Sequence, residues 1–148
     1  MRTLVLALLV IGGCAREDLP DPSAAPSRPM LQPVPANLET AILAGGCFWG
    51  MEELLRKIPG VVDTEAGYAA GAESVRVVFD PAKLSYATLL ERWYFRMHDP
   101  TTKNRQGNDV GDQYRSAIFY TTEAQRSTAT QVVNRVEARR DGLKHRDL

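Results

Sequence analysis

Apolar positions change their spacing several times from residue 40 onward, and each change indicates a new element. Residues 40–44 form a short apolar run that ends in two glycines, which predicts a buried strand. Apolar residues then recur at helical spacing over 48–58, before a Pro-Gly pair that ends the helix. Residues 61–69 and the alternating run 74–79 predict two further strands, which are joined by a turn at Gly71.

The second half of the folded region continues this pattern. Ser85 can cap a helix that extends to Met97 and has Trp93 among its apolar positions. A polar loop over 101–114 follows, and the apolar run 117–120 predicts a fourth strand.

A last helix is predicted after this strand, because Thr122 and Gln125 have the spacing of a capping box. The order of elements is therefore β-α-β-β-α-β, followed by a helix. This order is typical of the split β-α-β arrangement. We expect an α+β fold, a ferredoxin-like two-layer sandwich with an additional C-terminal helix.

The first 14 residues have the features of an export signal. Arg2 precedes an apolar run over 4–11, which is too short to span a bilayer. The sequence Ile11-Gly12-Gly13-Cys14 resembles a bacterial lipobox, in which the cysteine is lipidated and begins the mature protein. We therefore expect a signal peptide over 1–14 and lipidation at Cys14. An ordinary signal with a coincidental cysteine is the alternative.

Residues 15–36 are expected to form a tether. They contain six of the nine prolines and almost no apolar periodicity, which favours an extended, semi-rigid segment. The folded domain is then 37–148, which is long enough for one modest core. With the anchor, this organisation predicts a domain held at a membrane on the periplasmic side of a bacterial cell envelope.

The composition argues against several classes of function. Lysine plus arginine number 18, as do aspartate plus glutamate, so no overall positive charge attracts nucleic acid. Cys14 and Cys47 are the only cysteines, and the two histidines, His98 and His145, lie far apart in the sequence. Neither a disulfide framework nor a metal site is expected.

Cys47 is the candidate for chemistry, because it lies between a predicted strand end and a predicted helix start. Unpaired backbone N–H groups and the helix dipole stabilise a thiolate at such a position. Glycines on both sides leave the sulfur accessible, and Phe48 and Trp49 add an apolar surface beside it. This combination suits attack on a small, apolar electrophile. The alternative is a small buried hydrophobic residue, which is the commoner role of a lone cysteine.

Several motifs follow one another between residue 40 and about residue 123. They are Gly46-Cys47-Phe48-Trp49-Gly50, Ile58-Pro59-Gly60-Val61, Val77-Val78-Phe79-Asp80-Pro81, His98-Asp99-Pro100-Thr101, residues 104–111 and Gln113-Tyr114-Arg115-Ser116. Through these motifs the chain closely resembles the A-type peptide-methionine sulfoxide reductases. The resemblance implies an enzyme that reduces methionine S-sulfoxide, free or in proteins, and so repairs oxidised proteins.

The resemblance also implies a mechanism in which Cys47 is the nucleophile. It attacks the sulfoxide sulfur, methionine leaves, and Cys47 becomes a sulfenic acid. Many relatives have a later cysteine that resolves the sulfenic acid, but no cysteine follows Cys47 in this sequence. Cys14 is unsuited to that role if it is lipidated. We therefore expect no bound cofactor and an external thiol reductant, either a thioredoxin-like protein or a small thiol.

Five further residues match functional positions of the family. Phe48 and Trp49 resemble the pocket walls that receive the substrate methyl group. Glu73 matches the acid that binds and protonates the sulfoxide oxygen. Asp109 and Tyr114 match substrate-binding residues at the rim of the site. Without the resemblance, Glu73 is better interpreted as a solvated carboxylate, Asp109 as a turn residue and Tyr114 as a core residue.

The sequence departs from the family between Tyr68 and Glu73. Relatives have an additional loop there, with a second tyrosine of the sulfoxide-oxygen site and a Gly-His pair before the acid. Here Gly71 leads directly to Ala72 and Glu73, so one expected donor is missing and the tighter hairpin could displace the acid. Loss of one such donor costs on the order of a hundredfold in rate.

Three hypotheses therefore stay open at this point. The first is an active reductase that repairs envelope proteins. The second is a catalytically weakened or inactive family member that acts as a binding module, which the missing loop favours. The third is a structural lipoprotein in which a disulfide joins Cys14 to Cys47 or to a partner.

Overall fold

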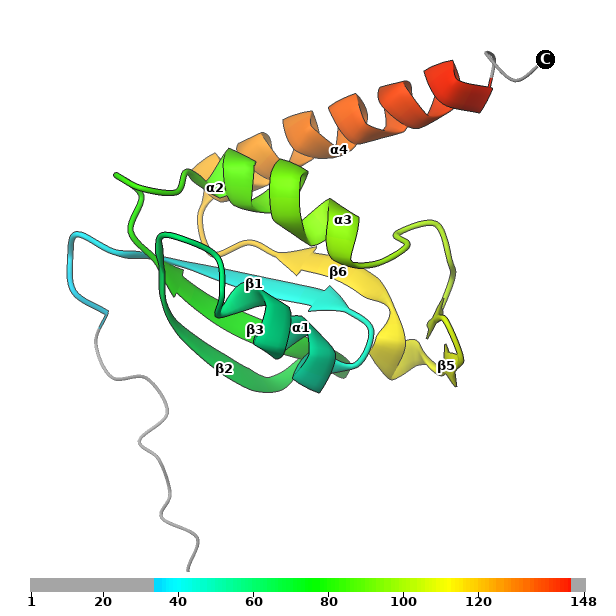
Figure 1. Cartoon of the computed structure of the whole chain (residues 1–148), viewed down its shortest axis with the longest axis horizontal. Helices are drawn as coiled ribbons and strands as arrows, with labels where there is room; N and C mark the ends of the chain where they lie inside the picture. Colours follow the sequence, from blue (N-terminus) through cyan, green and yellow to red (C-terminus); the bar gives the residue numbers. More distant parts are fainter. Residues whose placement is uncertain (1–33, 145–148) are drawn as a thin grey trace, which may run out of the picture. The chain divides into compact units, whose positions relative to one another are not determined.

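The computed structural model describes residues 34–144 of the chain, which form a four-stranded sheet with helices packed against it (Figure 1). The strands are β1 (Glu39–Gly45), β2 (Val61–Ala69), β3 (Ala72–Phe79) and β6 (Ser116–Phe119). Their order in the sheet is β2-β3-β1-β6, and each neighbouring pair is antiparallel. The four strands predicted from the apolar runs and the alternating segment are confirmed, and the fold class is α+β.

The helices are α1 (Phe48–Leu55), α2 (Tyr86–Thr88), η2 (Leu89–Tyr94), α3 (Phe95–Met97) and α4 (Glu123–Lys144). The segment from α2 to α3 is continuous and begins where predicted, because the Ser85 hydroxyl accepts a hydrogen bond from the backbone N–H of Thr88 at 3.2 Å. Its middle part, η2, has the wider turn of a π-helix. A wider turn changes which residues face inward.

One prediction within this segment is therefore wrong. Trp93, an apolar position of the expected α-helix, is 38% exposed, whereas the next residue, Tyr94, is completely buried. The inward face changes because η2 departs from the 3.6-residue period on which the prediction was based. Tyr94, rather than Trp93, fills the core at this point.

The start of α4 confirms half of the predicted capping box. The Thr122 hydroxyl accepts a hydrogen bond from the backbone N–H of Gln125 at 3.1 Å. The Gln125 side chain does not return to Thr122. Its oxygen accepts from the backbone N–H of Thr121 at 3.0 Å, and its amide nitrogen donates to the carbonyl oxygen of Thr40 at 2.7 Å. The glutamine thus connects α4 to the beginning of β1.

One hydrophobic core lies between the sheet and the helices. The sheet contributes alternate residues of β1 and β3, among them Leu43, Val75, Val77 and Phe79. The helices contribute Leu55 from α1, Leu89, Leu90 and Tyr94 from η2, and Val132 from α4. Because side chains alternate along a strand, Glu73 lies on the same face of β3 as these core residues and as α1.

The segment 101–114, predicted as an irregular polar loop, contains short elements instead. Strands β4 (Arg105–Gln106) and β5 (Asp109–Val110) form a hairpin, and η3 (Asp112–Tyr114) is a single 3₁₀ turn. Two positive φ angles, 49° at Asn104 and 56° at Gly107, allow the tight turns of this hairpin. Strands of two residues are too short to give an alternating pattern, which is why the sequence did not reveal them.

The predicted signal peptide, the lipidation site at Cys14 and nearly all of the predicted tether lie outside the described residues. Within residues 34–144, no helix combines the length and the hydropathy that a membrane span requires.

Candidate active site

Cys47 lies where β1 ends and α1 begins. Gly46 has a φ of +100°, a value that favours glycine, and it turns the chain from the strand into the helix. Cys47 is the N-cap residue of α1, and its carbonyl oxygen accepts a hydrogen bond from the backbone N–H of Met51 at 3.2 Å. Its thiol makes no capping hydrogen bond and is partly buried. The sulfur therefore lies at the positive end of the helix dipole, and no capping hydrogen bond engages it.

Glu73 lies directly beside this helix start. The backbone N–H of Phe48, the first residue of α1, donates a hydrogen bond to Glu73 Oε2 at 3.0 Å. The glutamate is only 8% exposed, so its carboxyl group is close to the peptide of Cys47 and shielded from water. The tight hairpin has thus not displaced Glu73 from the helix start that carries Cys47.

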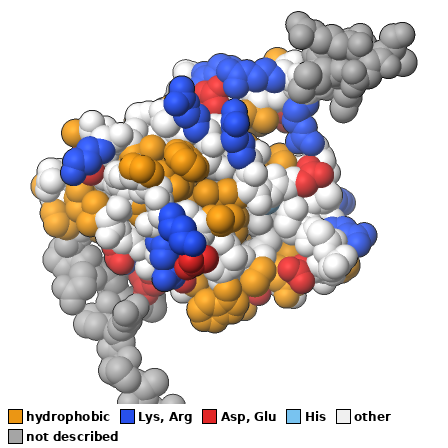
Figure 2. Space-filling model, viewed as in Figure 1, with side chains coloured by type: hydrophobic (Ala, Val, Ile, Leu, Met, Phe, Trp, Pro, Cys, Tyr) orange, Lys and Arg blue, Asp and Glu red, His pale blue; other side chains and the backbone are white. Residues whose placement is uncertain are grey.

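Three aromatic rings form a cluster next to Cys47. The Phe48 ring is central: it packs edge-on against Trp49, with ring centroids 5.0 Å apart, and against Tyr68, with centroids 5.4 Å apart. Trp49 is 68% exposed and Tyr68 is 67% exposed. Figure 2 shows hydrophobic side chains gathered on the surface around α1. Tyr68, which the sequence analysis did not select as a site residue, extends this apolar surface onto β2.

The hairpin of β4 and β5 forms the other side of the site. A Cβ atom on Gly46 would lie 2.7 Å from Gln106 Cγ, so the Gln106 side chain packs directly on the glycine before Cys47. Both amide atoms of Gln106 bind the backbone of Asp99, each at 3.0 Å, which fixes its position. Asp109 is the strand partner of Gln106 and is exposed. The hairpin therefore brings Asp109 to the rim near Cys47.

Tyr114 lies in η3, which packs against β3, the strand of Glu73. It is half-buried. The next residue, Arg115, donates from Nη2 to the carbonyl oxygen of Ala70 at 2.6 Å. This bond ties the turn between β2 and β3 to the segment that carries Tyr114.

A polar network supports the Cys47 loop from behind. The Tyr94 hydroxyl donates to the carbonyl oxygen of Ala44 at 2.7 Å and lies 3.1 Å from the Ser116 hydroxyl. His98 Nδ1 donates to the Tyr94 carbonyl oxygen at 2.9 Å, and His98 Nε2 lies 2.8 Å from Ser116 Oγ. Burial lowers the pKa of His98 below its ordinary value of 6.5, so the ring is neutral and Nε2 accepts from the serine.

We expect the network of Tyr94, His98 and Ser116 to be disturbed by the addition of a single methyl group at Gly45. A Cβ atom on Gly45 would lie 2.9 Å from two atoms of the His98 ring, and the two hydrogen bonds of that ring prevent it from moving away. Gly45→Ala should lower the free energy of unfolding by about 1–3 kcal/mol, as overpacking typically does. Urea denaturation measures this change.

Gly50→Ala is the matched control. Gly50 lies in α1, and nothing approaches its Cβ position within 4 Å. The same substitution should here raise the free energy of unfolding by about 0.5–1 kcal/mol, because alanine favours the helix. Equal effects of the two substitutions would contradict the close contact between Gly45 and His98.

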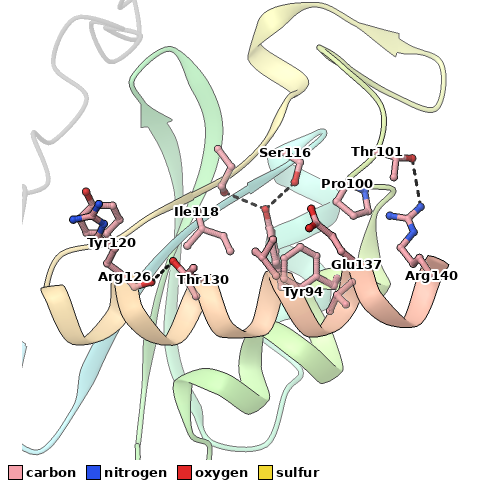
Figure 3. Close-up of a pocket in the computed structure, with 15 residues that line it drawn as sticks. Tyr94, Pro100, Thr101, Ser116, Ile118, Tyr120, Arg126, Thr130, Glu137 and Arg140 are labelled. Atoms are coloured by element: carbon pink, nitrogen blue, oxygen red, sulfur yellow. Dashed lines mark hydrogen bonds between the residues drawn. The ribbon is translucent and has the colours of Figure 1, made fainter. Parts of the chain in front are cut away.

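A separate hollow of about 680 Å³ lies between α4 and β6, and Figure 3 shows the hydrogen bond between Tyr94 and Ser116, two of the residues that line it. Neither Cys47 nor Glu73 lines it. The hollow is thus distinct from the site around Cys47. Within residues 34–144, no group of three or more metal-binding side chains is present.

Comparison with known proteins decides the family. The family model described as peptide methionine sulfoxide reductase matches residues 39–72 and 70–144. The chain belongs to the peptide methionine sulfoxide reductase family. The two matched segments meet at the turn between β2 and β3, which is the position at which the sequence departs from the family pattern.

Individual members of the peptide methionine sulfoxide reductase family are also similar to this chain. Peptide methionine sulfoxide reductase MsrA 1 of Mesorhizobium japonicum is 51% identical over 113 residues, which are 68% of this chain and 65% of the relative. The MsrA of Pseudomonas fluorescens is 51% identical over 113 residues, which are 68% of this chain and 54% of the relative. The chain thus spans less than two thirds of the length of these two relatives.

Solved structures of family members agree with the fold. Methionine sulfoxide reductase A of Corynebacterium diphtheriae superposes with a TM-score of 0.67 at 33% identity, covering 76% of this chain and 60% of that chain. Mxr1 of Saccharomyces cerevisiae in its reduced form superposes with a TM-score of 0.62 at 27% identity, covering 75% of each chain.

Proposed function

We propose that the protein reduces methionine S-sulfoxide, free or in proteins, to methionine, with Cys47 as its nucleophile. One observation carries this proposal: the Cys47 thiol and the buried Glu73 carboxyl group flank the same helix start, and Glu73 accepts the first N–H of α1. A nucleophile and a proton donor are thus within reach of one bound group. Reduction of oxidised methionine would make the protein an oxidoreductase that repairs oxidative damage.

The reaction follows from the chemistry of these two groups. The Cys47 sulfur attacks the sulfoxide sulfur while Glu73 gives a proton to the sulfoxide oxygen. The S–O bond of the substrate breaks and an S–O bond to Cys47 forms, so methionine leaves as the thioether and Cys47 becomes a sulfenic acid; the proton of the thiol restores the Glu73 carboxyl group. The substrate sulfur is reduced by two electrons, and the Cys47 sulfur is oxidised by two.

The remaining site residues would bind the substrate. Phe48 and Trp49 offer an apolar surface for the methyl group attached to the sulfoxide. Tyr114 and Asp109, at the rim formed by η3 and the β4–β5 hairpin, would orient the substrate by hydrogen bonds. The roles of Tyr114 and Asp109 are supported by their positions beside the elements that carry Glu73 and Gly46.

An external thiol would complete the cycle. Two thiol groups reduce the sulfenic acid of Cys47, with release of water and formation of a disulfide. Cys14 is the only other cysteine in the sequence. Support for a thioredoxin-like reductant comes from Mxr1, which has been solved in complex with Trx2 and superposes on this chain with a TM-score of 0.61 at 28% identity.

Two finer assignments belong to this proposal. The antiparallel order β2-β3-β1-β6 supports the ferredoxin-like, split β-α-β arrangement. The sequence at Ile11-Gly12-Gly13-Cys14 supports lipidation of Cys14 and attachment to the periplasmic side of a bacterial cell envelope. Mass analysis of the mature amino terminus tests the anchor, because an unmodified Cys14 would contradict it.

The activity is tested by incubating the chain with a peptide containing methionine S-sulfoxide and excess dithiothreitol. Chromatography quantifies the methionine formed, beside the Cys47→Ser variant and the R-sulfoxide epimer of the peptide. We expect turnover that requires Cys47 and prefers the S epimer. No turnover by a sample with a folded circular dichroism spectrum would overturn the proposal.

A second candidate is a binding module that has lost catalysis. It is favoured by the tight turn at Ala70 and Gly71, with φ angles of 46° and 76°, at the place where the family match is divided. This candidate predicts that the sulfoxide peptide binds without being reduced. The same incubation, with calorimetry of peptide binding, separates the two.

A further inference from the structure

Tyr68 is an exposed ring that the proposed reaction does not use. It is 67% exposed, and its ring packs edge-on against Phe48, 5.4 Å between centroids. In the sheet, Tyr68 lies directly opposite Glu73. Residues that are directly opposite on neighbouring strands point to the same face. The ring therefore borders the site on the side of β2, beside both the acid and the apolar pocket wall.

The backbone that carries the ring is also held in place. Tyr68 lies two residues before the turn at Ala70 and Gly71, whose positive φ angles of 46° and 76° make a tight hairpin. Arg115 Nη2 donates to the Ala70 carbonyl oxygen at 2.6 Å and fixes the hairpin from outside. A fixed aromatic ring contributes contact area on binding at a small cost in conformational entropy.

The aromatic cluster is larger than one methionine sulfoxide needs. In the proposed reaction the methyl group and the sulfur lie against Phe48 and Trp49, which leaves the Tyr68 ring without a contact to the methionine side chain. In an extended peptide, residues rise about 3.4 Å each, so the side chain two positions away lies on the same side at about 7 Å. Tyr68 is the next ring beside Phe48, with 5.4 Å between the centroids, so that second side chain would point toward the Tyr68 ring when the methionine side chain lies against Phe48.

We propose that Tyr68 is a specificity-determining residue that binds an apolar side chain two positions from the methionine sulfoxide of a polypeptide substrate. The inference rests on the proposed function and adds a preference to it. Polypeptides with a large apolar residue at that position should be bound better than glycine-flanked peptides or free methionine sulfoxide. The tyrosine contributes its apolar ring, not its hydroxyl group.

The test uses the full chain, dithiothreitol as reductant and three substrates. These are a pentapeptide with central methionine S-sulfoxide and leucine at both ends, the same peptide with glycine at both ends, and N-acetylmethionine S-sulfoxide. For Tyr68→Ala we expect the KM of the leucine peptide to rise roughly 3- to 10-fold, the range given by one aromatic contact. Its kcat, and both constants for the other two substrates, should stay unchanged.

Two variants serve as controls. Tyr68→Phe keeps the ring and should keep the wild-type KM. Tyr120→Ala removes a tyrosine that is 50% exposed and packs under Arg126, on the loop after β6. It should change no constant. A loss shared equally by all three substrates, or no change for any of them, would overturn the assignment of Tyr68 and leave the proposed reaction intact.

Binding without turnover separates this inference from the reaction itself. In the Cys47→Ser background, calorimetry should show the same preference for the leucine peptide, and Tyr68→Ala should remove it. Absence of turnover by the wild type alongside this preference would overturn the proposed reaction but support the role of Tyr68. Equal affinities for the leucine and glycine peptides would overturn that role.

Discussion

Glu73→Gln is expected to lower kcat by about 100-fold or more, because general acid catalysis contributes roughly 10²–10⁴-fold. The amide oxygen of glutamine can still accept the hydrogen bond that Phe48 N–H donates to Glu73 Oε2 at 3.0 Å. The start of α1 and the position of Cys47 are therefore kept. Only the proton that Glu73 would donate to the sulfoxide oxygen in the proposed reaction is removed. Steady-state kinetics on a methionine S-sulfoxide peptide measure the effect.

Two further variants make this result specific. Glu73→Ala also removes the acceptor of the partly buried Phe48 N–H, so it should cost about 1–3 kcal/mol of unfolding free energy in addition to activity. Glu65→Gln changes another carboxylate of the sheet, one that pairs with Arg76 at 2.9 Å on the far part of β2, and should keep kcat. A Glu73→Gln variant with nearly wild-type kcat would remove Glu73 from the chemistry.

The four main strands could be predicted from the sequence because each has a local signal. The run at 74–79 alternates, and β3 indeed has its core residues at Val75, Val77 and Phe79. The β4–β5 hairpin has no such signal. It is held by hydrogen bonds such as those between the Gln106 side chain and the backbone of Asp99. These two residues are seven positions apart in the sequence.

The residues of the site can likewise be divided into those with a local sequence signal and those without one. Cys47, Phe48 and Trp49 are neighbours in sequence, so the strand-to-helix junction was enough to bring them together. Glu73 is 25 residues from Phe48, and its contact with the helix start depends on the register between β1 and β3. Only the resemblance to the family selected Glu73. Tyr68 was missed because an exposed tyrosine on a strand has no local signal of function.

The support behind Cys47 was missed for a different reason. The distance of His98 from the other histidine in the sequence indicated only that no metal site is expected, and the helical spacing placed Trp93 among the apolar positions. Both judgements depended on periodicity or spacing. The role of Tyr94 comes from its hydroxyl, which reaches Ala44 at the end of β1, 50 residues away in sequence. Polar contacts between residues so far apart in the sequence form only when the packing of the fold brings the residues together.

The largest effect on stability is expected at Tyr94. Tyr94→Ala should lower the free energy of unfolding by about 3–5 kcal/mol, as other removals of buried aromatic rings do. Tyr94→Phe keeps the ring but removes the hydroxyl that bonds Ala44 at 2.7 Å and approaches Ser116 and Ala117, each at 3.1 Å. It should cost about 1–3 kcal/mol, because buried groups lose their partner. Urea denaturation measures both changes.

Tyr86→Phe provides the decisive comparison, because the core contains a second buried tyrosine with the opposite environment. The Tyr86 hydroxyl is buried without a hydrogen-bond partner in the described part of the chain, and burial raises its pKa to about 12. Removing this hydroxyl removes an unsatisfied polar group, so the variant should be as stable as the wild type or more stable. If Tyr94→Phe and Tyr86→Phe changed stability alike, ring burial alone would explain Tyr94. If they differ as expected, the hydrogen bond of the Tyr94 hydroxyl to Ala44 holds the end of β1, three residues before Cys47.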